Sequence, residues 1–266
     1  MKNKIIAIII IVLVLIGLFY LLSVNKTIAP TTEPVVQNTE PVNIPKEADK
    51  NDVKRVMETT EQTEIEFENS HTFSPNKKYK VVLAERLEEG DKNYITDDQG
   101  NRLTNDEWGY FIGWTSDSTK VILYASWDLK IYYLDIQGNY YDAGLPRDTY
   151  SAAYSPKDKS ISYVTGANSV DLYLRSNDGS DRVIVEGYGS SGFDYIKWSP
   201  LGNKIAFLTY NLNSPQETSY LVIIDSDGSN LTYIHNADWI PFRWSEDGSI
   251  ITFINDGYVW EYKVIK

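Results

Sequence analysis

Few residues of this chain have side chains of the types that perform catalysis or bind metals. The sequence contains no cysteine, which excludes disulfides, thiolate metal sites and a thiol nucleophile. The two histidines, His71 and His235, fall just before a predicted repeat and within a predicted outer strand, so we interpret both as structural. We therefore predict no catalytic residue and a protein that is not an enzyme.

Two short motifs look functional at first sight. Residues 187–193, GYGSSGF, resemble the loop of a nucleophilic serine, but neither Ser190 nor Ser191 has a glycine two positions away on both sides, as G-x-S-x-G requires. Residues 225–228 (DSDG) and 177–179 (NDG) resemble parts of calcium loops and lack the glutamate at the twelfth position. We interpret them as a loop and two hairpin turns and predict neither metal nor cofactor, with weak calcium binding left open.

An apolar segment comes first among the elements that would position a site. Residues 5–24, IIAIIIIVLVLIGLFYLLSV, carry no charge, and as a helix they span about 30 Å, the thickness of a bilayer core. Lys2 and Lys4 precede the run, which places residues 1–4 in the cytoplasm and the remainder in the periplasm or outside the cell. We predict a single-pass membrane anchor. A cleaved signal peptide is the alternative, although the run is long for one and Pro30 follows the best small-residue site.

Residues 25–62 are predicted to form a tether. Their first part is rich in proline and threonine and has no apolar periodicity, which is typical of disordered spacers. The later part is more charged, and we expect at most a short helix around residues 52–57 that buries little. The tether would hold a folded domain, residues 63–266, away from the membrane.

Five similar segments recur in that domain. Each begins with an aromatic residue followed by a turn and an apolar strand, and consecutive aromatics are 41, 40, 44 and 46 residues apart. A third strand, a glycine- or asparagine-containing turn and a fourth strand follow, as in antiparallel hairpins. A period of about 40–45 residues is typical of propeller blades. We predict an all-β fold, a five-bladed β-propeller of four-stranded blades, in which Trp114, Trp198 and Trp244 pack between blades. The leading aromatics of the five segments are Phe73, Trp114, Tyr154, Trp198 and Trp244.

These repeats resemble those of the TolB family, a group of WD40-like β-propellers. WSPLGNKIAF at residues 198–207 and IIDSDGSN at residues 223–230 match its consensus best. The resemblance covers residues 63–266 and implies the fold. TolB itself has six blades behind an α/β domain, so the resemblance does not imply its partners here. The last repeat lacks a fourth strand, and we predict that TEIEFEN, residues 63–69, supplies it. Chains beginning at residue 61 should then melt normally, and chains beginning at residue 71 much lower.

Further aromatic residues are expected at the end of the blades that carries the longer loops. Exposed aromatics on one face are suited to recognising a partner, since they offer contact area at low entropic cost. The net charge of −12 disfavours nucleic acid. We predict an extracytoplasmic module that binds a protein or an envelope polymer; the alternatives are a structural subunit of an envelope complex, assembled partly through the membrane helix, and a sugar or small-ligand sensor. The candidate binding residues are Trp108, Tyr110, Trp127, Tyr188, Tyr210 and Trp239.

Overall fold

The computed structural model describes residues 46–63, 72–87, 90–165, 171–186, 196–210, 219–236 and 241–264. Asn43–Lys266 form one compact unit. Within the described ranges, no helix is long and apolar enough to cross a membrane. The predicted anchor at residues 5–24 and the first part of the predicted tether lie outside these ranges.

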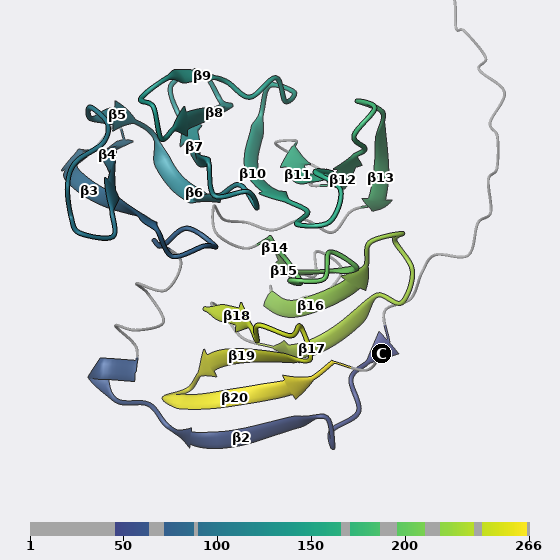
Figure 1. The fold of residues 1–266 in the computed structure, drawn as a ribbon. Helices are drawn as coiled ribbons and strands as arrows, with labels where there is room; N and C mark the ends of the chain where they lie inside the picture. The colour runs from purple at the N-terminus through teal and green to yellow at the C-terminus, as the bar shows by residue number, and fades with distance from the viewer. Residues whose placement is uncertain are drawn as a thin grey trace, which may run out of the picture. The chain divides into compact units, whose positions relative to one another are not determined.

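The described chain is all-β and forms five sheets, one for each sequence repeat (Figure 1). The first sheet contains β3 (Tyr79–Leu87), β4 (Gly90–Asp97) and β5 (Glu107–Trp108). The second contains β6 (Tyr110–Trp114), β7 (Lys120–Ala125), β8 (Lys130–Asp135) and β9 (Tyr140–Asp142). The third contains β10 (Thr149–Tyr154), β11 (Ile161–Thr165), β12 (Asp171–Arg175) and β13 (Asp181–Val185).

The last two sheets each include a strand from the N-terminal side of the unit. The fourth contains β14 (Lys197–Trp198), β15 (Lys204–Tyr210), β16 (Ser219–Asp225), β17 (Thr232–Asn236) and, parallel to β17, β1 (Lys46–Glu47). The fifth contains β18 (Phe242–Trp244), β19 (Ile250–Asn255), β20 (Tyr258–Lys263) and, antiparallel to β20, β2 (Val53–Glu58). The four-stranded sheets have the architecture expected of blades.

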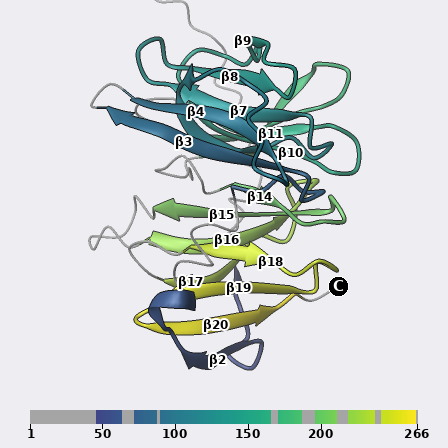
Figure 2. The same ribbon diagram turned by 60° about the vertical axis from the view of Figure 1, so that its left-hand side comes forward.

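Neighbouring sheets share apolar cores because each inner strand is apolar on both faces. Along β15, Ile205 and Phe207 lie in a core with the third sheet, while Ala206 and Leu208 lie in a core with the fifth. This period of two is the pleat of a strand packed on both sides. Figure 2 shows the strands of the fourth and fifth sheets running side by side. Two further cores join the first sheet to the second and the second to the third.

The repeated tryptophans join consecutive blades, as predicted. The indole nitrogens of Trp114, Trp198 and Trp244 donate hydrogen bonds to backbone carbonyls of the preceding blade. Each acceptor residue stands immediately before the leading aromatic of that blade, and the N···O distances are 3.1–3.2 Å. The repeat period therefore encodes a polar contact as well as apolar packing. The ion pair of Lys77 and Glu246, 3.4 Å apart, joins the turns of the first and fifth blades.

The strand that completes the fifth blade is not the predicted one. β20 has β19 on one side and β2 on the other, so β2 occupies the position predicted for residues 63–69, of which 64–69 lie outside the described ranges. Residues 53–58, assigned to the tether with a short helix, form an edge strand instead, and residues 46–47 also form a strand. Most side chains of β2 are exposed. The sequence of this strand therefore lacks the alternation of apolar and polar residues that predicts a strand. The alternation in TEIEFEN is the stronger sequence signal for this position, which β2 takes.

Candidate functional site

Two of the six predicted binding residues meet at one end of the first two blades. Trp108 ends β5, and Trp127 lies in the turn between β7 and β8. Their rings are 6.4 Å apart between centroids and nearly perpendicular, at 87°. Gly90, at the start of β4, lies against both rings: a Cβ built there would be 3.9 Å from Trp127 and 4.0 Å from Trp108. The Trp127 side chain remains 53% exposed.

The backbone and side chain of Trp108 are held from two directions. The Tyr140 hydroxyl donates a hydrogen bond of 2.8 Å to the Trp108 carbonyl. The Lys92 ammonium lies 5.0 Å from the centroid of the indole, a cation–π distance, and pairs with Glu85 at 2.8 Å. These contacts hold Trp108 in place. Trp127 packs against it and remains exposed to solvent.

Acidic groups surround the tryptophan pair. Asp128 accepts a hydrogen bond from the Tyr132 hydroxyl through Oδ2, while its buried Oδ1 has no hydrogen-bond partner among the described residues. Burial, aided by the charge of Asp106, raises the pKa of Glu107. Carboxylates beside an exposed aromatic ring favour a cationic or hydrogen-bond-donating group on a partner.

Of the four remaining predicted binding residues, one is half-buried, and the side chains of the other three lie outside the described part of the structure. Tyr110 packs against Tyr124 with a centroid distance of 6.4 Å and is half-buried. Tyr210 ends β15, and its side chain is outside the description. Tyr188 and Trp239 also lie outside the described residues. The structure therefore brings Trp108 and Trp127 together and leaves the rest of the predicted surface untested.

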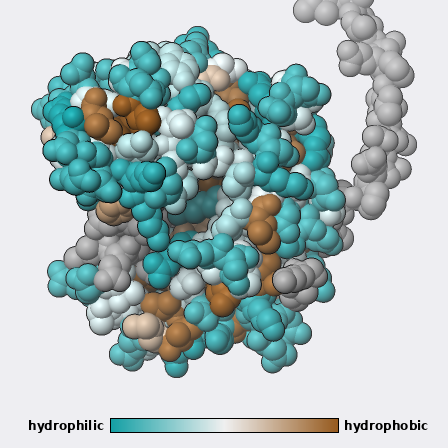
Figure 3. Space-filling model, in the orientation of Figure 1, coloured by the Kyte–Doolittle hydropathy of each residue, from teal (hydrophilic) through white to brown (hydrophobic). Residues whose placement is uncertain are grey.

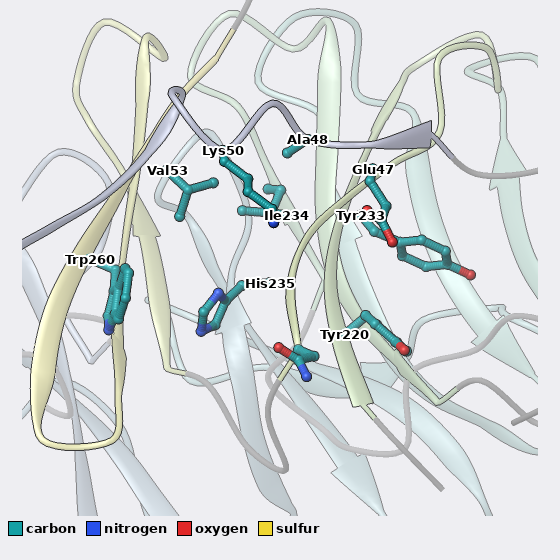
Figure 4. Close-up of a pocket in the computed structure, with 10 residues that line it drawn as sticks. Glu47, Ala48, Lys50, Val53, Tyr220, Tyr233, Ile234, His235 and Trp260 are labelled. Carbon is teal, nitrogen blue, oxygen red and sulfur yellow. The ribbon is translucent and has the colours of Figure 1, made fainter. Parts of the chain in front are cut away.

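The sequence did not predict a pocket of about 650 Å³ that lies between residues 46–53, here called the N-terminal segment, and the fourth and fifth blades (Figure 4). Its volume is in the range of about 300–1,000 Å³ that small-molecule sites occupy. Aromatic, aliphatic and polar side chains line it, and Figure 4 shows Lys50 reaching from the N-terminal segment toward Ile234. The lining residues are Glu47, Ala48, Lys50, Val53, Tyr220, Tyr233, Ile234, His235, Asn236 and Trp260.

The aromatic side of this pocket is a packed array. Tyr220 and Tyr233 lie 4.7 Å apart between centroids, and His235 lies 5.1 Å from Trp260. Nδ2 of Asn255 is 3.0 Å from Nε2 of His235, and an amide nitrogen donates only to an unprotonated ring nitrogen. Burial lowers the pKa of His235, while Asp256 opposes that effect, so the imidazole is neutral at neutral pH.

No sequence motif predicts that these residues line a pocket. They belong to outer strands of two blades and to a segment of tether-like composition, and only the packing of those elements makes them neighbours. The one hint in the sequence is the aromatic content of the third and fourth strands of these repeats, including Tyr220, Tyr233 and Trp260.

The acidic turns build hairpins. Asp227 Oδ1 accepts hydrogen bonds from the backbone nitrogen and hydroxyl of Ser229, and these bonds lower its pKa. Gly179 and Gly228 have φ of +85° and +90°, as expected for such turns. Within the described ranges, no three acidic or histidine side chains gather into a metal site.

The face seen in Figure 3 is mostly hydrophilic, with apolar side chains in small separate patches and a hollow near its middle. Such a surface offers local aromatic contacts in place of one large apolar interface.

Comparison with solved structures supports the fold. The chain is similar to a protein from Agrobacterium tumefaciens assigned as a TolB, with 20% identity and a TM-score of 0.52 over 73% of each chain. It is also similar to TolB from Acinetobacter baumannii, with 17% identity and a TM-score of 0.54; the match covers 73% of this chain and 53% of that one, about half its length. No family model and no curated protein matches the sequence. At this identity the comparison establishes the fold alone: the chain has the β-propeller fold seen in TolB-like structures.

Proposed function

We propose that this protein is a membrane-anchored, extracytoplasmic binding module that captures a partner protein through Trp108 and Trp127. The edge-to-face pair of half-buried Trp108 and exposed Trp127 is the observation that carries this proposal. Tryptophan is enriched among residues that dominate binding energy, and truncating such a residue costs about 2 kcal/mol or more.

The surrounding charge favours a protein partner that presents lysine or arginine. Asp128 follows Trp127 and Glu107 precedes Trp108 in the sequence. A basic side chain placed over Trp127 would satisfy both the aromatic face and the carboxylates. The uncharged run at residues 5–24, preceded by Lys2 and Lys4, supports the anchor and the orientation.

In-cell crosslinking of the full-length protein, followed by mass spectrometry of captured proteins, tests the binding surface. We expect one dominant envelope protein, bound about thirtyfold more weakly by Trp127→Ala. Leu201→Ala is the matched control, because Leu201 is 59% exposed in the turn between β14 and β15, at the opposite end of the strands. Undiminished capture by Trp127→Ala would contradict the proposal. Loss of capture only when residues 5–24 are replaced by an unrelated helix would favour a structural subunit instead.

The intact mass of the protein recovered from membranes tests the anchor. An uncleaved anchor gives the mass of the whole chain. A species beginning near residue 25 or 30 would show that the apolar segment is a cleaved signal.

A further inference from the structure

The pocket beside Trp260 has walls from two distant parts of the chain. Glu47, Ala48 and Lys50 come from β1 and the segment leading to β2, and Val53 is the first residue of β2. The opposite wall comes from β16, β17 and β20, strands of the fourth and fifth blades. The N-terminal segment therefore completes a site that the blades alone would leave open.

The N-terminal wall is attached to β17 by backbone hydrogen bonds, and Ala48 and Val53 pack against the core of the fourth and fifth blades. The backbone nitrogens of Lys46 and Ala48 donate to the carbonyls of Leu231 and Tyr233, at 3.1 and 2.8 Å. β1 is only two residues long, and both of its residues are exposed. A strand with so little burial has low local stability, so its docking responds to small energies.

The next residues form a compact turn that carries Lys50. Asp49 accepts hydrogen bonds from the backbone nitrogen of Asp52 and, through its side chain, from that of Asn51. This turn holds Lys50 at its tip, and Figure 4 shows the side chain directed across the pocket. A ligand that contacts Lys50 would therefore also stabilise the docked position of the whole segment.

The chemistry of the lining matches a sugar ring. Tyr220, Tyr233 and Trp260 line the pocket with aromatic rings, the side chains whose flat apolar surface suits the C–H surface of a pyranose. Glu47, Lys50 and Asn236 supply a carboxylate, an ammonium and an amide, which together accept and donate hydrogen bonds to hydroxyl groups. A single lysine in a chain of net charge −12 gives little attraction for a phosphorylated ligand.

We propose that this pocket binds a saccharide of one or two rings, and that the N-terminal segment closes on it. Because the ligand contacts both walls, binding and the docking of β1 stabilise each other, as linkage between two equilibria requires. This site is separate from the tryptophan pair and does not depend on the capture of a protein there.

The first test measures saccharide binding by the full-length protein in lipid nanodiscs, since sugar-headed detergents would compete. The probes are an immobilised panel of mono- and disaccharides of glucose, galactose, mannose and N-acetylglucosamine, followed by titration of those retained. We expect saturable binding, weakened about tenfold by Lys50→Met and by Asn236→Ala, the loss that follows from removing one or two hydrogen bonds. Lys54→Met is the matched control, because Lys54 is exposed on β2, pairs with Glu261 and does not line the pocket.

Trp127→Ala should also bind the sugar normally, which separates this site from the protein-capture surface. The absence of saturable binding to every member of the panel would overturn the proposal, as would equal affinity in Lys50→Met, Asn236→Ala and the unaltered protein.

The second test addresses the coupling to the N-terminal segment. Bound sugar should slow hydrogen exchange at the backbone nitrogen of Ala48. Lys46→Pro removes the hydrogen bond to the Leu231 carbonyl without altering a lining side chain, and we expect it to weaken sugar binding several-fold. Unchanged exchange together with unchanged affinity would show that the segment does not close on the ligand.

Discussion

Val53 of β2 lies directly opposite Tyr262 of β20, although the two residues come from opposite ends of the folded unit. Val53 also packs against the core shared by the fourth and fifth blades. The backbone nitrogen of Lys263 donates to the carbonyl of Asp52, which extends the same pairing. The last blade is therefore completed by a strand that precedes the first blade in the sequence.

Removing β2 should destabilise the domain. A chain beginning at residue 61 loses the partial burial of Val53, worth about 1 kcal/mol, and the ladder hydrogen bonds, about 1 kcal/mol each. A loss of about 3 kcal/mol corresponds to a fall in Tm of roughly 6–12 °C for a domain of this size. Thermal unfolding compared with a chain beginning at residue 46 measures this. Equal Tm values would show that β2 is not needed to close the last blade.

The hydrogen bond from Trp198 to the Ala153 carbonyl should contribute separately from the ring. Trp198→Phe retains an aromatic ring and loses the indole donor, so we expect a cost of about 1 kcal/mol. Trp198→Ala also empties a buried site and should cost about 3–5 kcal/mol. Denaturant unfolding gives both values. Trp127→Ala, at an exposed position, serves as the control and should change stability by less than about 0.5 kcal/mol.

Gly202 should tolerate a side chain less well than Gly138, although both have positive φ. The φ of Gly202 is +65°, and an added Cβ would stand 2.6 Å from the Cβ of Lys157 in the preceding blade. Gly138 has φ +88° and nothing within 4 Å of that position. Gly138→Ala should cost about 1 kcal/mol from backbone strain, and Gly202→Ala a further 1–3 kcal/mol, roughly, from overpacking. Equal losses of unfolding free energy for the two variants would show that the turns carrying Gly202 and Lys157 move apart to accommodate the added methyl group.

His235 should make stability depend on pH. Its pKa is lowered in the folded protein, chiefly by burial, so below its usual value of 6.5 the unfolded chain binds a proton that the folded protein does not. Stability therefore falls as the pH decreases from about 6.5 toward the lower folded pKa, and it is fully retained above 6.5. His235→Gln removes this contribution.

The difference in unfolding free energy between the unaltered protein and His235→Gln, measured from pH 7.5 to pH 5, isolates the effect from that of the carboxylates. The unaltered protein should lose stability relative to the variant as the pH falls. A difference that is constant with pH would show that His235 is protonated equally in both states.

The sequence shows the blades with good accuracy because each blade repeats its own local signals. The apolar pleat of β15, the glycine turns and the recurrent Trp198-type positions all lie within one period of about 40–45 residues, and the structure confirms an all-β fold with one sheet per repeat. The tryptophan pair could be predicted only in part from the sequence. Its members were identified as exposed aromatics, but the 6.4 Å contact between Trp108 and Trp127 depends on how two blades pack.

The N-terminal strands and the pocket could be decided only by tertiary structure. β2 is an edge strand whose side chains are mostly exposed, so its pairing is written in backbone hydrogen bonds to β20 and not in apolar periodicity. The pocket joins Lys50 to Trp260 across nearly the whole folded unit, and no local pattern records such a distant contact. By itself, the sequence determined the repeat, the turns and the charge, because these depend on neighbours in the chain. The closing strand and the sites depend on neighbours in space.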